Sequence, residues 1–125
     1  MKEVMAIVRM NMMNKTKNAL LKAGISSLNA NECLGRGKGL VNLPVLNGAE
    51  KRYEEMMNEL GNAGRLVPKR ILRVVVPNKL VKTVVDAIIS VNKTGRSGDG
   101  KIFVLPIAEA WQVRTSLSGE EILDQ

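Results

Sequence analysis

Residues 71–107 have the sequence ILRVVVPNKLVKTVVDAIISVNKTGRSGDGKIFVLPI, and this stretch decides the fold. It opens with a β-branched run at 71–76 that is typical of a strand, and Pro77 ends the hydrogen bonding of that strand. Asn78 is expected to cap a helix, because apolar residues then recur at helical spacing, at Val81, Val84, Val85 and Ile88. A glycine-rich turn follows, and 102–107 is again apolar. The stretch predicts one strand–helix–strand unit.

The N-terminal part of the chain predicts a second unit of the same kind. In residues 4–10 both alternating sets of side chains are largely apolar, which indicates a strand buried on both faces. A helix is expected at 14–23, with Asn14 as its cap and Gly24 as its left-handed stop. An alternating stretch that ends at Gly35 then predicts another strand.

Two such units predict an α+β fold, a ferredoxin-like βαββαβ sandwich with both helices on one face of an antiparallel sheet. A short terminal strand is expected at 111–115, and the length of the chain predicts a single domain over residues 1–125. Since two helices cover only one face of the sheet, the apolar strands predict an oligomer whose sheets pack inward.

The segment between the two units, about 36–65, predicts a long loop between strands 2 and 3. Six glycines from Gly35 to Gly64, together with Pro44, interrupt any strand period, although 49–60 has the pattern of a short amphipathic helix. Long irregular connections are usually functional. We therefore expect a partner-binding loop here, and a C-terminal loop at 112–125.

Composition and charge narrow the classes of partner. The net charge of +7 predicts anionic partners, but a single Phe, Tyr and Trp argue against RNA binding by base stacking. The basic residues are scattered rather than gathered on one helix, so no nucleic acid is expected. One cysteine, no apolar leader and no apolar run of ~20 residues predict a cytoplasmic protein without membrane insertion.

Catalytic residues are not evident in this sequence. There is no histidine, and Cys33 lies in an expected strand, where a small buried apolar side chain is the simpler interpretation. Glu32, Asp86 and Asp99 fall on separate elements and form no acid–base pair. The sequence predicts neither an enzyme nor a metal site made by protein ligands.

The segment 94–101, TGRSGDGK, is the candidate binding motif. Its spacing matches G-x-x-x-x-G-K, yet Ile102 stands where a magnesium-binding Ser or Thr belongs. The segment also leaves a helix and enters a strand, the reverse of a P-loop, which excludes a P-loop NTPase. Two interpretations stay open: an anion-binding turn with Arg96 and Lys101, or an ordinary tight turn. The cluster at 35–39 is equally ambiguous.

Residues 94–104, TGRSGDGKIFV, resemble the signature Thr-Gly-x-x-Gly-Asp-Gly-Lys-Ile-Phe-Val of the PII nitrogen-regulatory signalling proteins. Three shorter segments resemble other parts of that family: Gly48-Ala49-Glu50, Pro68-Lys69 and Arg114-Thr115. The resemblance covers the whole chain. It implies a trimer of ferredoxin-like subunits that acts in signal transduction and in nitrogen regulation.

The resemblance also implies ligands and the residues that bind them. ATP or ADP would lie in clefts between subunits, with magnesium held through the ATP phosphates and with 2-oxoglutarate beside them; these are effectors rather than tightly bound cofactors. The implied nucleotide-binding residues are Gly35, Arg36, Gly37, Lys38, Thr94, Gly95, Gly98, Asp99, Gly100, Lys101 and, from the neighbouring subunit, Arg114. The implied 2-oxoglutarate-binding residues are Gly37, Lys38 and Lys69.

Two departures from the family pattern point to a subgroup. The loop base 34–39 has no Gln, and the stretch between Glu50 and Pro68 is longer than in most members. Both features resemble the nitrogenase-associated PII proteins, which act on dinitrogenase as homotrimers or as mixed hexamers with a second PII-like subunit. Regulation of an ammonium transporter or of a biosynthetic enzyme is the alternative. A slow ATPase is the alternative from a different class, and it would need a positioned base.

Overall fold

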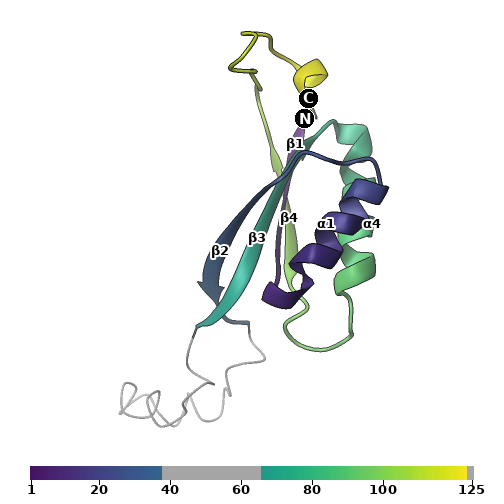
Figure 1. Ribbon diagram of the computed structural model, residues 1–125, viewed down its shortest axis with the longest axis vertical. Helices are drawn as coiled ribbons and strands as arrows, with labels where there is room; N and C mark the ends of the chain where they lie inside the picture. The colour runs from purple at the N-terminus through teal and green to yellow at the C-terminus, as the bar shows by residue number, and fades with distance from the viewer. Residues whose placement is uncertain (38–65, 124–125) are drawn as a thin grey trace.

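The protein is built around a four-stranded sheet with strand order β2-β3-β1-β4, in which every neighbouring pair is antiparallel (Figure 1). The computed structural model describes residues 1–37 and 66–123. The elements are β1 (Lys2–Arg9), α1 (Met13–Lys22), β2 (Asn29–Gly35), β3 (Val67–Val76), α4 (Val81–Asn92) and β4 (Lys101–Pro106). This order confirms the predicted ferredoxin-like βαββαβ sandwich. Within the described residues no helix has the length and apolarity needed to cross a membrane.

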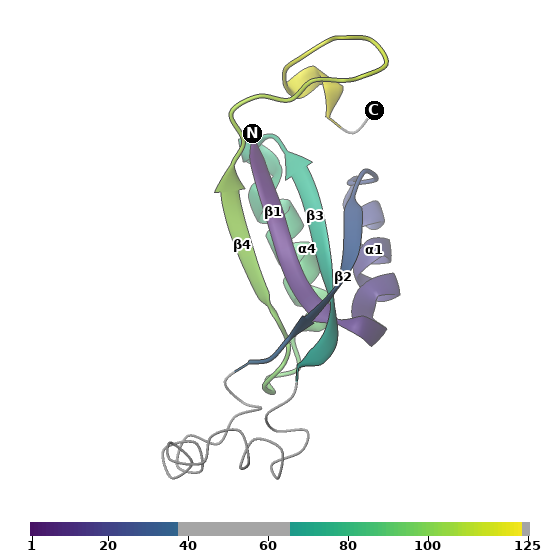
Figure 2. The same cartoon turned by 90° about the vertical axis from the view of Figure 1, so that its left-hand side faces the viewer.

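The core lies between the sheet and the two helices, which cover the same face (Figure 2). Every second residue of β1 and β3 is buried there, because successive strand side chains alternate between faces. The predicted apolar face of α4 is confirmed: Val84 and Ile88 are buried, and Val81 and Val85 pack beside them. The buried apolar residues are Val4, Ala6, Val8, Met13, Leu20, Ile25, Leu72, Val74, Val76, Val84 and Ile88.

Within the part of the chain that the structure describes, no helix covers the second face of the sheet, as the sequence predicted (Figure 2). Met5 faces Phe103 across β1 and β4, and Glu3 faces Leu105. Phe103 and Leu105 are 45% and 39% exposed in the single subunit. Large apolar side chains on an uncovered sheet are typical of a surface that another protein covers.

The expected helix caps, Asn14 and Asn78, are both wrong. A 3₁₀ turn (Met10–Met12) precedes α1, and another (Asn78–Leu80) precedes α4, and neither helix has a side-chain cap hydrogen bond. At the second turn the Leu80 N–H donates to the Pro77 carbonyl over 3.0 Å. The 3₁₀ turn provides backbone acceptors where a cap side chain would otherwise act.

Element boundaries differ modestly from the prediction. β3 begins at Val67, four residues earlier than expected, because Val67 and Pro68 pair with Gly35 and Leu34 at the end of β2. Gly24 has φ +88 and ends α1 as predicted, with the Ile25 N–H donating to the Leu20 carbonyl over 2.9 Å. Cys33 lies in β2 but is only half-buried, since β2 is an edge strand.

The predicted strand at 111–115 is wrong. The structure has a chain reversal there, with a single bridge between Trp111 and Ser118, and the Gln112 N–H donates to the Leu117 carbonyl over 2.8 Å. Ser116 adopts φ 63, a left-handed conformation that a continuous strand does not contain. The expected helix at 49–60 and most of the loop at 36–65 lie outside the described residues.

Candidate functional site

The connection from α4 to β4, residues 93–100, is the centre of the candidate site. Three of its glycines have positive φ, at +82 for Gly95, +93 for Gly98 and +113 for Gly100. At Gly100 a Cβ atom would lie 2.0 Å from the carbonyl oxygen of Ile7. Only glycine therefore allows the loop to approach the backbone of β1 so closely.

The Asp99 carboxylate closes this connection into a loop. It accepts hydrogen bonds from the Thr94 N–H at 2.7 Å, the Gly95 N–H at 2.9 Å and the Thr94 hydroxyl, and it pairs with the Arg9 guanidinium at 2.8 Å. The Thr94 hydroxyl and N–H, with smaller contributions from Arg9 and Gly95, hold the pKa of Asp99 well below its usual range. The carboxylate is thus ionised at neutral pH and engaged within the loop.

Two cations of the sheet hold the loop from its other side. Arg9 Nη2 donates to the Ser97 carbonyl over 3.0 Å, and Lys69 Nζ donates to the Gly98 carbonyl over 3.4 Å. Arg9 ends β1 and Lys69 is its register partner on β3, so both side chains leave the same face of the sheet. Strand pairing therefore brings residues 29 to 90 positions apart into one cluster.

A cleft of about 280 Å³ lies beside this cluster. It is lined by Gly37, two residues after β2, Lys69 from β3, Arg9 from β1 and Gly98 from the loop. Three residues that the sequence proposed as ligand-binding, Gly37, Lys69 and Gly98, thus meet in one place. Lys38 lies outside the described residues.

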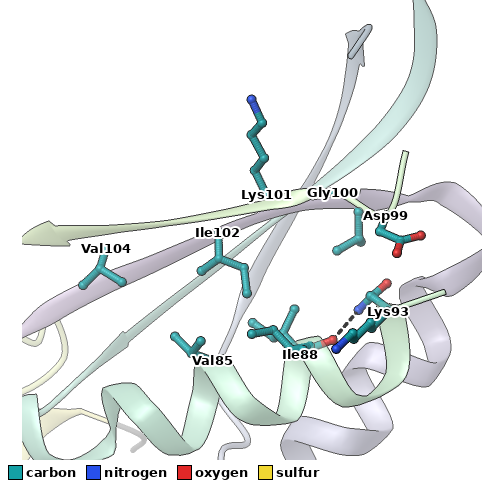
Figure 3. Close-up of a pocket in the computed structure, with 11 residues that line it drawn as sticks. Val85, Ile88, Lys93, Asp99, Gly100, Lys101, Ile102 and Val104 are labelled. Atoms are coloured by element: carbon teal, nitrogen blue, oxygen red, sulfur yellow. Dashed lines mark hydrogen bonds between the residues drawn. The ribbon is translucent and has the colours of Figure 1, made fainter. Parts of the chain in front are cut away.

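A second, apolar cavity of about 440 Å³ lies between α4 and β4 (Figure 3). Val85 and Ile88 of α4 and Ile102 and Val104 of β4 point toward one another across it, whereas Lys101 points away, beyond the opposite side of β4 (Figure 3). The Lys101 side chain therefore belongs to the uncovered face of the sheet, with Arg9 and Lys69.

The predicted nucleotide-binding residues fall into two groups. Those of the 94–101 segment lie at one end of the sheet, and Gly35, Arg36 and Gly37, at the end of β2, lie at the same end (Figure 1). The segment that carries Arg114 follows β4 and lies at the opposite end (Figure 1). Arg114 therefore does not reach the loop of its own subunit, and its approach from a neighbouring subunit stays a prediction.

Arg9 belongs to the candidate site by its contacts, and the sequence did not indicate it. Its one available signal was a charged side chain at the end of an otherwise apolar strand, directly before a helix. Its partners, Ser97 and Asp99, are 88 and 90 positions away, and no local pattern connects them.

The charges of this end of the sheet suit an anionic ligand. Arg9, Lys69 and Lys101 supply positive charge, and Asp99 pairs with Arg9 alone among them. Among residues 1–37 and 66–123, no group of three His, Cys, Asp or Glu side chains gathers to hold a metal ion.

Comparison with known proteins agrees with this architecture. The chain matches the family profile "Nitrogen regulatory protein P-II" over residues 1–117. It is 43% identical to "Nitrogen fixation nifHD region GlnB-like protein 2" of Methanobacterium ivanovii, over 98% of this chain and 99% of that protein. It is 44% identical to the protein of the same name from Methanococcus maripaludis, over 96% of this chain and 98% of that one.

A solved structure shows the same fold. The crystal structure of Arabidopsis thaliana PII bound to citrate matches with a TM-score of 0.71 at 30% identity, and the match covers 96% of this chain and 86% of that one. The chain belongs to the P-II family of nitrogen regulatory proteins. Within that family its relatives place it in the subgroup associated with the nitrogen-fixation gene region.

Proposed function

We propose that this protein senses ATP or ADP together with 2-oxoglutarate and regulates dinitrogenase by direct protein–protein contact. The family consists of regulatory proteins, and the relatives in the nitrogen-fixation region support nitrogenase as the target. One observation carries the ligand part of the proposal. It is the glycine loop closed by Asp99, with Arg9, Lys69 and Lys101 beside it.

The loop has the properties that a phosphate group requires. Gly98 and Gly100 present backbone without side chains, and within the described residues their N–H groups have no hydrogen-bond acceptor. Converging N–H groups with a lysine nearby form a recurrent phosphate-binding arrangement. In this proposal the Gly98 and Gly100 N–H groups bind the phosphates, and Lys101 supplies a positive charge that attracts them. Thr94 and Gly95 keep the loop in shape through their hydrogen bonds to Asp99.

The same geometry suits a carboxylate effector in the adjoining cleft. Lys69, with Gly37 and Lys38, would bind a carboxylate of 2-oxoglutarate, and magnesium would be held through the ATP phosphates because Asp99 is already engaged. The Arabidopsis relative binds citrate, a tricarboxylate, which supports carboxylate binding within the family.

Assembly completes the proposed site. Trimers are typical of the family, and the uncovered apolar face offers the surface that they would bury. Arg114, at the far end of its own sheet, would then reach the phosphates bound to a neighbouring subunit. Sedimentation of the purified protein should give a trimer, or a mixed hexamer when the second PII-like subunit is added. A stable monomer at micromolar concentration would contradict this.

Calorimetric titration with ATP and ADP tests the nucleotide site. Lys101→Ala should weaken the binding of ATP and of ADP by at least about tenfold, because a charge-assisted hydrogen bond contributes roughly 1.5–3 kcal/mol. Lys79→Ala is the matched control, since Lys79 lies in the 3₁₀ turn at the other end of α4. Affinity at the wild-type level in Lys101→Ala would remove the phosphate assignment.

The effector and the target need separate measurements. We expect 2-oxoglutarate to bind only when magnesium-ATP is present, and equal binding with and without ATP would contradict the effector site. A reconstituted nitrogenase assay tests the target. A chain with residues 42–63 replaced by a short Gly-Ser linker should keep its ATP affinity and lose inhibition. If the shortened protein still inhibits, the partner contacts another part of the trimer.

A further inference from the structure

We propose that Arg9 is a positioning residue that couples the two anion sites, so that an anion in the cleft is sensed by the nucleotide loop. This inference rests on the proposed function for the identity of the two ligands. The part of it that concerns the loop itself can be tested without any ligand. Arg9 contacts the loop, lies opposite Lys69 in the sheet register, and borders the cleft.

Arg9 fixes the loop at two separate points. Its Nη1 donates to the Asp99 carboxylate over 2.8 Å, and its Nη2 donates to the Ser97 carbonyl over 3.0 Å. A Cβ atom added to Gly98 would lie 3.4 Å from the same Nη2, so the guanidinium rests directly against the loop backbone. A planar guanidinium that bonds two groups restrains their relative position as well as their distance.

The register of the sheet places Arg9 directly opposite Lys69 on one face. Two like charges at such a position destabilise a pair of antiparallel strands. Asp99 offsets one of the two charges, and the Lys69 contact to the Gly98 carbonyl is long, at 3.4 Å. One positive charge therefore remains uncompensated among these three side chains. A local cost of this kind is typical of a binding site.

Arg9 also borders the cleft in which Gly37 and Lys69 would bind the effector. Only two of the five guanidinium N–H groups are needed for the contacts to Asp99 and Ser97. An anion in the cleft would offset the excess charge between Arg9 and Lys69 and accept a further N–H from Arg9. It would thereby strengthen the hold of Arg9 on the loop. Binding in the cleft should then favour the loop conformation that binds phosphate. By linkage, phosphate bound to the loop should favour anion binding in the cleft to the same degree.

Amide hydrogen exchange of the ligand-free protein tests the positioning role. The Thr94 and Gly95 N–H groups donate to Asp99, so their exchange reports whether the carboxylate stays in place. Arg9→Met should speed exchange at both residues at least about threefold, and Arg9→Lys should restore part of the protection because it keeps the charge.

Arg70→Met is the matched control for this measurement. Arg70 lies one residue from Lys69, but its register partner is the buried Val8, on the other face of the sheet. It pairs with Glu32 at 2.8 Å rather than with the loop. Exchange at Thr94 and Gly95 should therefore stay at the wild-type level. Wild-type exchange in Arg9→Met, or an equal increase in Arg70→Met, would overturn the positioning role.

Calorimetry tests the coupling. In the wild type, saturating 2-oxoglutarate should tighten magnesium-ATP binding about a hundredfold, near the upper end of the usual range for coupling between sites, because the effector is expected to need magnesium-ATP. In Arg9→Met this ratio should fall at least about tenfold, while ATP still binds, and Arg9→Lys should give an intermediate ratio. An undiminished ratio in Arg9→Met would overturn the coupling. A wild type that binds no nucleotide would overturn the proposed function and the coupling together, and the exchange experiment would still decide whether Arg9 positions the loop.

Discussion

The two halves of the molecule connect a helix to a strand in different ways. After α1, the connection to β2 needs one left-handed glycine, Gly24, and backbone hydrogen bonds from Gly24 and Ile25 to the last turn of the helix. After α4, the connection to β4 contains three left-handed glycines and is tied to the sheet by Asp99, Arg9 and Lys69.

Both connections serve the same topology, so the difference shows what the fold itself requires. A helix that returns to an antiparallel sheet needs a C-terminal stop and a short turn, and the first half has these features. The extra glycines and the ion pair of the second half are therefore not demanded by the chain path. They give one end of the sheet a fixed, positively charged loop, which is the feature that supports the proposed function.

The largest expected effect separates the two glycine turns. Gly100→Ala would place a Cβ against the Ile7 carbonyl in a left-handed conformation, and it should lower the free energy of unfolding by about 3 kcal/mol. Gly24→Ala meets no atom within 4 Å and should cost only about 1 kcal/mol, from its positive φ alone. Urea unfolding at one protein concentration compares them. Equal losses would contradict the close approach of loop and strand.

A change of charge in the second connection should alter the pH dependence of stability. The pKa of Asp99 is lowered in the folded protein, so its contribution is fully present above its unfolded value of 3.8 and is lost as the pH falls toward the folded-state pKa. Asp99→Asn should therefore have a lower free energy of unfolding than the wild type at neutral pH. The difference between the two free energies should become smaller in acid. Unfolding between about pH 6 and pH 2.5 measures this, and a constant gap would contradict the assignment.

Removal of one hydroxyl in the same loop should have a smaller effect. The Thr94 hydroxyl donates to Asp99 and accepts from the Arg96 N–H over 3.2 Å. Thr94→Val keeps the shape and removes both contacts, which should lower the free energy of unfolding by about 1 kcal/mol. Thr83→Val, on the exposed side of α4, is the matched control and should change little. A loss in the control as large as that in Thr94→Val would argue against the loop as its cause.

The smallest expected effect concerns a feature that the two halves share. Both helices begin after a 3₁₀ turn and without a side-chain cap. Asn14→Ala and Asn78→Ala should each change the free energy of unfolding by less than about 0.5 kcal/mol, where a capping residue would cost about 1 kcal/mol. Thermal unfolding of the two variants is sufficient, and a cap-sized loss in either one would restore the capping role predicted from the sequence.

Local pattern predicted the elements well where it was long and periodic. The spacing of Val84 and Ile88 identified the buried face of α4, and the glycine at position 24 identified the end of α1. The predicted strand at 111–115 is wrong because a short alternating stretch does not specify which strand it would pair with. The chain turns back on itself here instead, with the Gln112 N–H bonded to the Leu117 carbonyl. The start of β3 was also misplaced, since pairing with β2 extends the strand beyond its own propensity.

The sequence by itself determined the order of the elements, the single layer of helices, and the glycine-rich segment at 94–101. These features rest on side-chain periodicity and on backbone freedom, which act over a few residues. Only the tertiary structure decided that Arg9 and Lys69 stand side by side and hold that segment, and that Lys101 faces away from α4. The reason is that strand register, which joins residues far apart in the chain, is fixed by the packing of the whole sheet.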